Sequence, residues 1–283
     1  MATQYFLKAM TAIMLLAGSA LALEQVKEVP PPQSWDKFTI LVAQFHTNVI
    51  KDKALYESVN FRGFHIDRSK PDLQAFARET QWPFYVDHAA DKGYLHLKEK
   101  VRKEMTGKKP IQIRPNSLAD PQTIDAMKQH LKINIGSAKG SSVFAYSFDD
   151  EISLASFTTP IEVDAHPLSI IGFQKVLKAE YMNIETLNAQ YGGSFKDFAD
   201  VKPKGYEEFR AQLKPKELGK LNLSLWCDWH SYMDTQFAEC LADLTRYSNE
   251  LDQNTPAGIS RRAGAERLRR IRLPQTLQGG AVD

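Results

Sequence analysis

Phe144-Ala-Tyr-Ser-Phe-Asp-Asp-Glu151 is an apolar, aromatic run that leads directly into three consecutive acids. This pattern predicts a buried strand whose carboxyl end opens on a site. Like charge and burial both raise the pKa of a carboxyl group, as a general acid requires, so we predict that Glu151 is a general acid. An acidic helix cap or a solvated loop after the strand would account equally well for the three acids.

Three similar apolar runs precede this stretch, at residues 38–45, 61–67 and 82–87, and the fourth run covers 142–148. Continuous apolar strands are typical of parallel sheets buried on both faces. Helical patterns separate them, for example over Asp72 to Arg78 and from Pro121 onward. Strands that alternate with helices predict right-handed βαβ units. The fold class is therefore α/β, a partial (β/α)8 TIM barrel of about five βα units over residues 38–260.

The predicted strands end in histidine and aspartate side chains. In a barrel the carboxyl ends of all strands open on one face, where active sites lie. Such side chains can hydrogen-bond a polar substrate, and we predict substrate binding by His46, His65, Asp67, Asp87, His88 and Asp150. The same set could hold a divalent metal, but it lacks the local spacing of a metal motif, so we expect neither a metal nor a cofactor.

Later segments resemble a known enzyme family. Residues 164–181 and 184–195 read as a helix, a short helix and a glycine turn, similar to the segment after the fourth strand in glycoside hydrolase family 42. Leu225-Trp-Cys-Asp-Trp-His-Ser-Tyr-Met-Asp234 resembles the aromatic, acidic helix of the same family. The resemblance covers about residues 140 to 260. It implies a TIM barrel with an acid/base glutamate at the end of strand four, at the position of Glu151. The family usually has Asn-Glu where this chain has Asp150-Glu151.

The resemblance also implies an activity. The expected function is that of a secreted glycoside hydrolase that cleaves O-glycosidic bonds, similar to a β-galactosidase, with carbohydrate as its partner. A retaining glycosidase needs a second carboxyl group about 5 Å from the first, and this family places it at the end of strand seven. Two other classes stay open: a carbohydrate-binding protein without catalysis, and a surface-associated interaction protein.

Residues 1–22 have the pattern of a secretory signal peptide. Lys8 precedes an apolar run from Ala9, and Ser19-Ala-Leu-Ala22 forms a small-x-small cleavage site. The run is short for a membrane span, so we expect a secreted or periplasmic protein without a stable membrane span after cleavage, although an uncleaved anchor stays open. Residues 23–37 form a proline-rich lead into the barrel.

The overall charge excludes no small-molecule chemistry but argues against two kinds of partner. The formal net charge is +2, so neither nucleic acid nor a strongly anionic partner is expected.

The two cysteines, Cys227 and Cys240, fall on one predicted helix, about 20 Å apart. They are therefore expected to be free thiols.

Residues 261–283 differ from the rest of the chain. Six arginines lie within 261–272, whereas the preceding 260 residues contain seven. A basic, exposed helix is one interpretation. Alternatively, the stretch after Ser260, back-translated and shifted by one nucleotide, reads as a glycine-rich loop followed by a helix. We therefore expect that a frameshift has replaced the barrel after strand five with an aberrant tail, and has removed the nucleophile.

Overall fold

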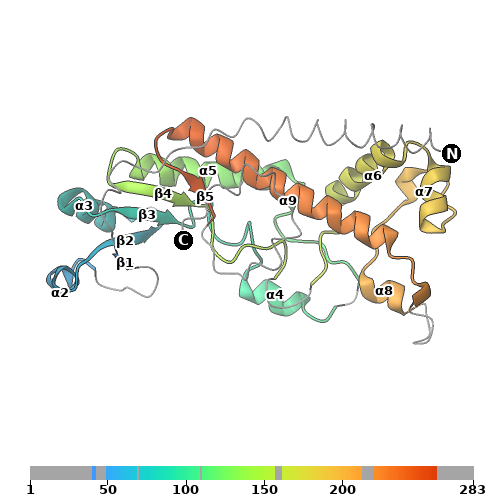
Figure 1. Cartoon of the computed structure of the whole chain (residues 1–283), viewed down its shortest axis with the longest axis horizontal. Coiled ribbons are helices and arrows are strands. Elements are labelled where there is room, and N and C mark those ends of the chain that lie inside the picture. Colours follow the sequence, from blue (N-terminus) through green and yellow to red (C-terminus); the bar gives the residue numbers. More distant parts are fainter. Residues whose placement is uncertain are drawn as a thin grey trace, which may run out of the picture.

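A parallel sheet of five strands organises the computed structural model, which describes residues 40–42, 49–68, 70–108, 110–156, 161–211 and 219–259 (Figure 1). Its strands are β1 (Ile40–Val42), β2 (Phe61–Asp67), β3 (Phe84–Asp87), β4 (Val143–Ser147) and β5 (Ala257–Gly258). They lie in chain order, each parallel to the next. This arrangement confirms the predicted partial barrel.

The two faces of the sheet differ in polarity because successive side chains of a strand point to opposite sides. Phe64, Ile66, Phe84 and Val86 are fully buried. They pack with apolar side chains of the helices α3 (Pro71–Thr80), α5 (Pro121–Ala138) and α9 (Ser224–Leu251). The alternate residues are polar, and Asp67 of β2 lies in register with Asp87 of β3. The pleat therefore separates the helix-covered core from the polar strand ends.

The remaining helices are α2 (Lys53–Ser58), α4 (Glu99–Met105), α6 (Pro167–Tyr181), α7 (Ile184–Tyr191), the 3-10 turn η2 (Phe198–Asp200) and α8 (Tyr206–Arg210). Local sequence explains where some of the helices begin or end. The Asp120 carboxylate accepts a hydrogen bond from the Gln122 N–H at the start of α5. Gly192, with φ of 63°, ends α7 in the left-handed conformation that glycine adopts without strain, as the predicted glycine turn requires.

Helix α9 joins two cores and is 28 residues long. Near its start, Trp229 and Met233 pack with Phe173 of α6, whereas Phe237 and Leu244 pack under the sheet. Figure 1 shows the helix running from the sheet to the group formed by α6, α7 and α8. Its length therefore holds this second group of helices beside the partial barrel.

Both cysteines lie on α9, as predicted, and both are free. Cys227 is exposed and Cys240 is buried. Burial raises the pKa of the Cys240 thiol to about 12, so this thiol stays protonated at neutral pH and behaves as an apolar side chain.

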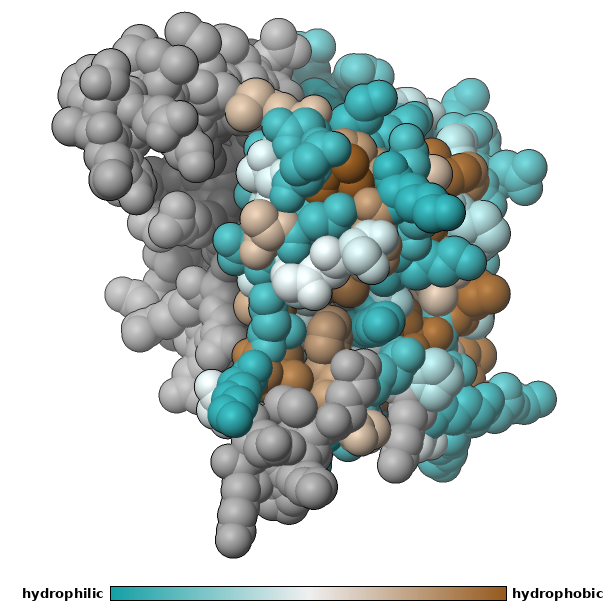
Figure 2. Space-filling view, turned by 90° about the vertical axis from the view of Figure 1, so that its right-hand side faces the viewer, coloured by the Kyte–Doolittle hydropathy of each residue, from teal (hydrophilic) through white to brown (hydrophobic). Residues whose placement is uncertain are grey.

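The surface at the α6–α8 end is mainly hydrophilic, with separate small apolar patches (Figure 2). No helix within the described residues is both long and apolar enough to cross a membrane. The predicted signal peptide, the proline-rich lead, His46 and the arginine-rich tail all lie outside the described residues.

A buried hydrogen bond connects β4 to the end of α9. The Tyr146 hydroxyl donates to Oδ2 of Asp252 over 2.7 Å, and the two residues are 1% and 3% exposed. We expect Tyr146→Phe to lower the free energy of unfolding by about 1–3 kcal/mol, because it leaves a buried carboxylate oxygen without its donor. Urea unfolding measures this change.

The matched control is Tyr206→Phe, on an exposed tyrosine of α8. It should change the free energy of unfolding by less than about 0.5 kcal/mol. Equal effects of the two substitutions would show that the Tyr146–Asp252 bond does not contribute to stability.

Candidate active site at the carboxyl ends of the strands

His88 links the ends of three strands. Its Nδ1 lies 3.1 Å from Oδ1 of Asp67, the last residue of β2, and its Nε2 lies 3.1 Å from Oδ1 of Asp150, just after β4. Both partners are carboxylate oxygens, so an imidazole that bonds to both must donate from both nitrogens, which only the positively charged imidazolium can do. Burial opposes this charge, but the hydrogen bond with Asp67 and the charge of Asp87 raise the pKa of His88 above its usual value. His88, in its charged form, therefore connects the ends of β2, β3 and β4 through hydrogen bonds.

The carboxyl groups around His88 have pKa values displaced in opposite directions. The hydrogen bond from His88 lowers the pKa of Asp67 well below its usual range, although burial opposes the shift, and Arg68 adds to it. For Asp150, burial raises the pKa, but Lys92 and His88 outweigh it and the net shift is downward. Burial is the main cause that raises the pKa of Asp87, which is 2% exposed. The cluster thus combines ionised acids with one acid that is held closer to protonation.

Asp149 and His96 extend the cluster beyond the predicted residues. The Asp149 carboxylate is fully buried, and its Oδ1 accepts a hydrogen bond of 2.9 Å from the Asp150 N–H. Its Oδ2 lies 2.9 Å from Nδ1 of His96, which belongs to the loop between β3 and α4. The geometry of this contact is not that of a hydrogen bond, so Nδ1 of His96 and Oδ2 of Asp149 both lack a hydrogen-bond partner among the described residues. His96 follows no strand end and belongs to no motif, so sequence patterns offered no signal for it.

Arg68 and His88 directly follow β2 and β3, and Glu151 lies four residues after the end of β4; all three adopt a left-handed backbone conformation. The φ angles are 59° for Arg68, 52° for His88 and 49° for Glu151. Residues other than glycine rarely adopt this region, which costs roughly 1–2 kcal/mol for each residue. Backbone strain of this kind concentrates at functional sites. The three turns support the assignment of a functional site to this edge of the sheet.

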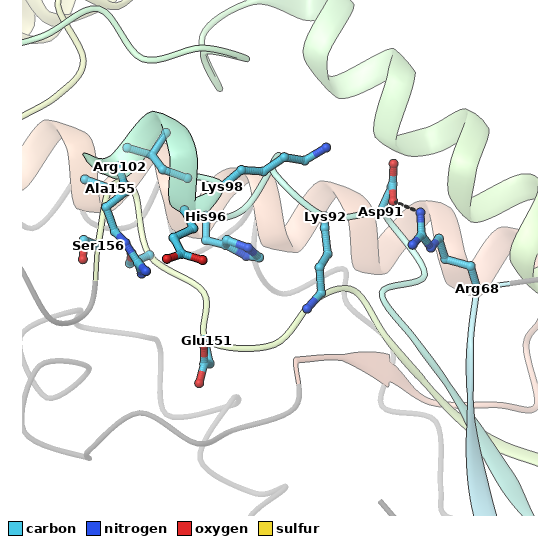
Figure 3. Close-up of a pocket in the computed structure, with 12 residues that line it drawn as sticks. Arg68, Asp91, Lys92, His96, Lys98, Arg102, Glu151, Ala155 and Ser156 are labelled. Carbon is cyan, nitrogen blue, oxygen red and sulfur yellow. Dashed lines mark hydrogen bonds and ion pairs between the residues drawn. The ribbon is translucent and has the colours of Figure 1, made fainter. Parts of the chain in front are cut away.

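A cavity of about 490 Å³ lies beside the cluster. Its lining includes Arg68, Asp91, Lys92, His96 and Glu151. Figure 3 shows the ion pair of 2.9 Å between Arg68 and Asp91 at one side, and Lys92 extending toward the loop that follows β4. The volume falls in the range of small-molecule sites. Charged donors and acceptors form much of the lining, which suits a polar ligand.

The structure brings together four of the predicted site residues, Asp67, Asp87, His88 and Asp150, in direct contact or through His88. Glu151 comes next in the chain and lines the cavity, but it is exposed, and in Figure 3 its carboxylate projects away from Lys92 and His96.

His65 lies on β2 two residues before Asp67, further from the strand end than the cluster. It is 8% exposed, and its ring packs against Tyr85 with the ring centroids 5.6 Å apart. His65 shares a face of β2 with Asp67, because the two are two residues apart. Its predicted contact with substrate stays a prediction.

Solved structures share this architecture. The β-galactosidase from Bacillus circulans sp. alkalophilus superimposes with a TM-score of 0.56 at 9% sequence identity, over 80% of this chain and 37% of that chain. The β-galactosidase from Rahnella sp. R3 gives 0.53 at 11% identity, over 82% of this chain and 37% of that chain. The β-galactosidase from the haloarchaeon Halorubrum lacusprofundi gives a TM-score of 0.52 at 11% identity, over 77% of this chain and 35% of that chain.

No family model matches the sequence, and no curated protein matches it. The chain spans little more than a third of the length of the β-galactosidases above. At identities this low, structural likeness establishes the fold alone. The described part of the chain therefore has a partial TIM-barrel fold of the kind found in β-galactosidases.

Proposed function

We propose that this chain is part of a secreted glycoside hydrolase of the β-galactosidase type, which acts on O-glycosidic bonds with Glu151 as the proton donor. The observation that carries the proposal is the cluster of Asp67, Asp87, His88 and Asp150 beside the cavity. The fold of the described residues agrees with it. Secretion rests on the apolar pattern of residues 1–22 alone.

The cluster is suited to grip sugar hydroxyls in a fixed orientation. Asp67 and Asp150 both accept from His88, and Asp67 keeps a second carboxylate oxygen that can accept from a hydroxyl group. His88 and the paired cations Arg68 and Lys92 hold these carboxylates ionised and in place. Hydrogen bonds to charged groups are roughly twice as strong as those between neutral groups, so a ligand that satisfies them is bound selectively.

Glycan binding tests the proposal without requiring catalysis. Calorimetry with a galacto-oligosaccharide should show binding, and Asp67→Asn should weaken it by about 10- to 100-fold, since hydrogen bonds to charged groups contribute roughly 1.5–3 kcal/mol. The matched control is Asp72→Asn, on an exposed aspartate in the first turn of α3. It should bind like the unchanged protein. Equal affinities of the two variants, or no binding of galactosides by the folded protein, would contradict the proposal.

The exposure of Glu151 favours a second candidate, a carbohydrate-binding protein without hydrolytic activity. The acid of a glycosidase is normally surrounded by apolar groups, whereas Glu151 is exposed. Binding of glycans that is abolished by His88→Ala but accompanied by no hydrolysis would support this candidate over the enzyme.

A further inference from the structure

His96 and Asp149 can form an ion pair when His96 is protonated, but their closest atoms make no hydrogen bond. Nδ1 of His96 and Oδ2 of Asp149 are 2.9 Å apart, both atoms are buried, and neither has a hydrogen-bond partner among the described residues. The other oxygen of Asp149 accepts from the Asp150 N–H, so the carboxylate is held with Oδ2 directed at His96. A buried carboxylate oxygen and a buried ring nitrogen are costly when left unsatisfied. A common binding partner would satisfy both atoms.

We propose that His96, Asp149 and Asp150 bind a divalent transition-metal ion, with Zn²⁺ as the best match. One donor atom of each residue lies within 4.8 Å of the donor atoms of the other two. Zinc bonds to nitrogen and carboxylate oxygen are about 2.0–2.2 Å long, which places neighbouring ligands of a tetrahedral site about 3.4 Å apart. The two closest donors, at 2.9 Å, need to separate only slightly to admit the ion.

Asp150 is positioned to supply the third ligand atom. Its Oδ1 accepts from Nε2 of His88, which leaves Oδ2 for a metal. The other ring nitrogen of His88 bonds to Asp67, so His88 and Asp67 orient the Asp150 carboxylate. Partners of this kind, which hold the ligands of a metal in place, are typical of protein metal sites.

Asp87, His88 and Asp150 form an alternative group at ligand distance, but it is a poorer site. Both nitrogens of His88 are already occupied, by Asp67 and Asp150. His88 would have to break one of these hydrogen bonds and lose a proton before it could coordinate a metal. Nδ1 of His96 has no hydrogen bond to lose, and the carboxylate that it contacts belongs to Asp149, which is itself a ligand of the proposed site, so the group that contains His96 is favoured.

The donor set selects the class of ion. One imidazole nitrogen and two carboxylate oxygens suit Zn²⁺ or Mn²⁺, whereas Ca²⁺ and Mg²⁺ prefer sites made of oxygen atoms. Access comes from the cavity, whose lining includes His96, Lys92 and Glu151 (Figure 3). Three protein ligands leave further coordination positions open to water or to a ligand in the cavity.

Lys92 competes with the metal ion for the Asp150 carboxylate. Its Nζ lies 3.5 Å from Oδ1 of Asp150, and its side chain is 43% exposed, so it can turn toward solvent when a metal binds. Removing this charge should strengthen metal binding, because like charges near a cation weaken it. Lys92→Met is therefore expected to bind Zn²⁺ several-fold more tightly than the unchanged protein.

Calorimetry on the full chain, freed of metal with a chelator, tests the site with Zn²⁺ and with Mg²⁺ as the control ion. We expect one Zn²⁺ per chain and much weaker binding of Mg²⁺. Asp149→Asn and His96→Ala should each weaken Zn²⁺ binding at least 100-fold. His96→Ala keeps the test decisive if the buried Asp149→Asn variant fails to fold, because His96 is 19% exposed in its side chain.

The matched control is His130→Ala, on a half-exposed histidine of α5 outside the site. It should bind Zn²⁺ like the unchanged protein. Zinc affinity that is insensitive to His96→Ala, or that falls equally in His130→Ala, would overturn the proposal and indicate adventitious binding. The test involves no sugar, so its outcome is independent of the proposed glycosidase function.

Discussion

Arg114→Met is expected to lower the free energy of unfolding by about 3–5 kcal/mol, because it removes a charged side chain that satisfies several buried groups. Arg114 is 1% exposed. Its guanidinium donates to the carbonyl oxygen of Leu154 over 2.7 Å and to those of Asn116 and Tyr94. The backbone N–H of Arg114 donates to Oδ1 of Asp164 over 2.7 Å. The side chain thus ties together three loops on the carboxyl side of the sheet.

Methionine has a similar length but no donor, so those carbonyl oxygens would be left buried and unpaired. Arg114 stays charged at neutral pH. Burial lowers its pKa to about 10, and the nearby Asp164 carboxylate opposes the shift. The loss therefore includes strong, charge-assisted hydrogen bonds.

Urea and thermal unfolding measure the effect, and a loss of this size lowers the melting temperature by roughly 6–20 °C for a domain of this size. The matched control is Arg210→Met, on an exposed arginine that forms a surface ion pair of 3.4 Å with Glu207. It should change stability by less than about 1 kcal/mol. If Arg114→Met is as stable as this control, the three loops do not depend on the buried guanidinium.

On the proposed function, Glu151→Gln is expected to reduce the turnover of unactivated glycosides by about 100- to 10,000-fold. An amide has no acidic proton to give to a leaving group. Aryl glycosides with a good leaving group, such as nitrophenolate, need little protonation and should lose much less activity. Parallel assays of both substrate types measure the difference.

Glu99→Gln is the control for this substitution. Glu99 lines the same cavity but forms an exposed ion pair of 2.7 Å with Lys103. The change should leave the turnover of both substrate types unaltered. An equal loss on both types in Glu151→Gln would show that Glu151 does not act as the acid.

Local pattern predicted the scaffold well. The second apolar run became β2 with the predicted bounds, Phe61–Asp67, and the run at 142–148 became β4. Helix α5 begins at Pro121, as predicted. These features depend on interactions between near neighbours in the chain, namely side-chain alternation in strands and capping at helix starts. The parallel order of strands followed from the alternation of strands and helices.

The same reasoning located part of the candidate site. Each strand end opens at the same edge of a parallel sheet, so Asp67, Asp87, His88 and Asp150 could be placed together from the sequence. The sequence could not tell that His88 would bond to both Asp67 and Asp150. The lateral distances between strands, on which these bonds depend, are set by the folded sheet.

The sequence alone thus determined the order of the strands and which edge of the sheet carries the polar groups, because both follow from short-range periodicity. Folding in three dimensions decided the role of His96, which meets Asp149 from a loop far away in the chain, and that of Arg114, which bonds to Leu154 across 40 positions. Loop residues carry no periodic signal, and the energy of a buried polar contact depends on partners that only the packed structure assembles. For this reason the sequence predicted no metal ligands, whereas the structure supports a candidate metal site.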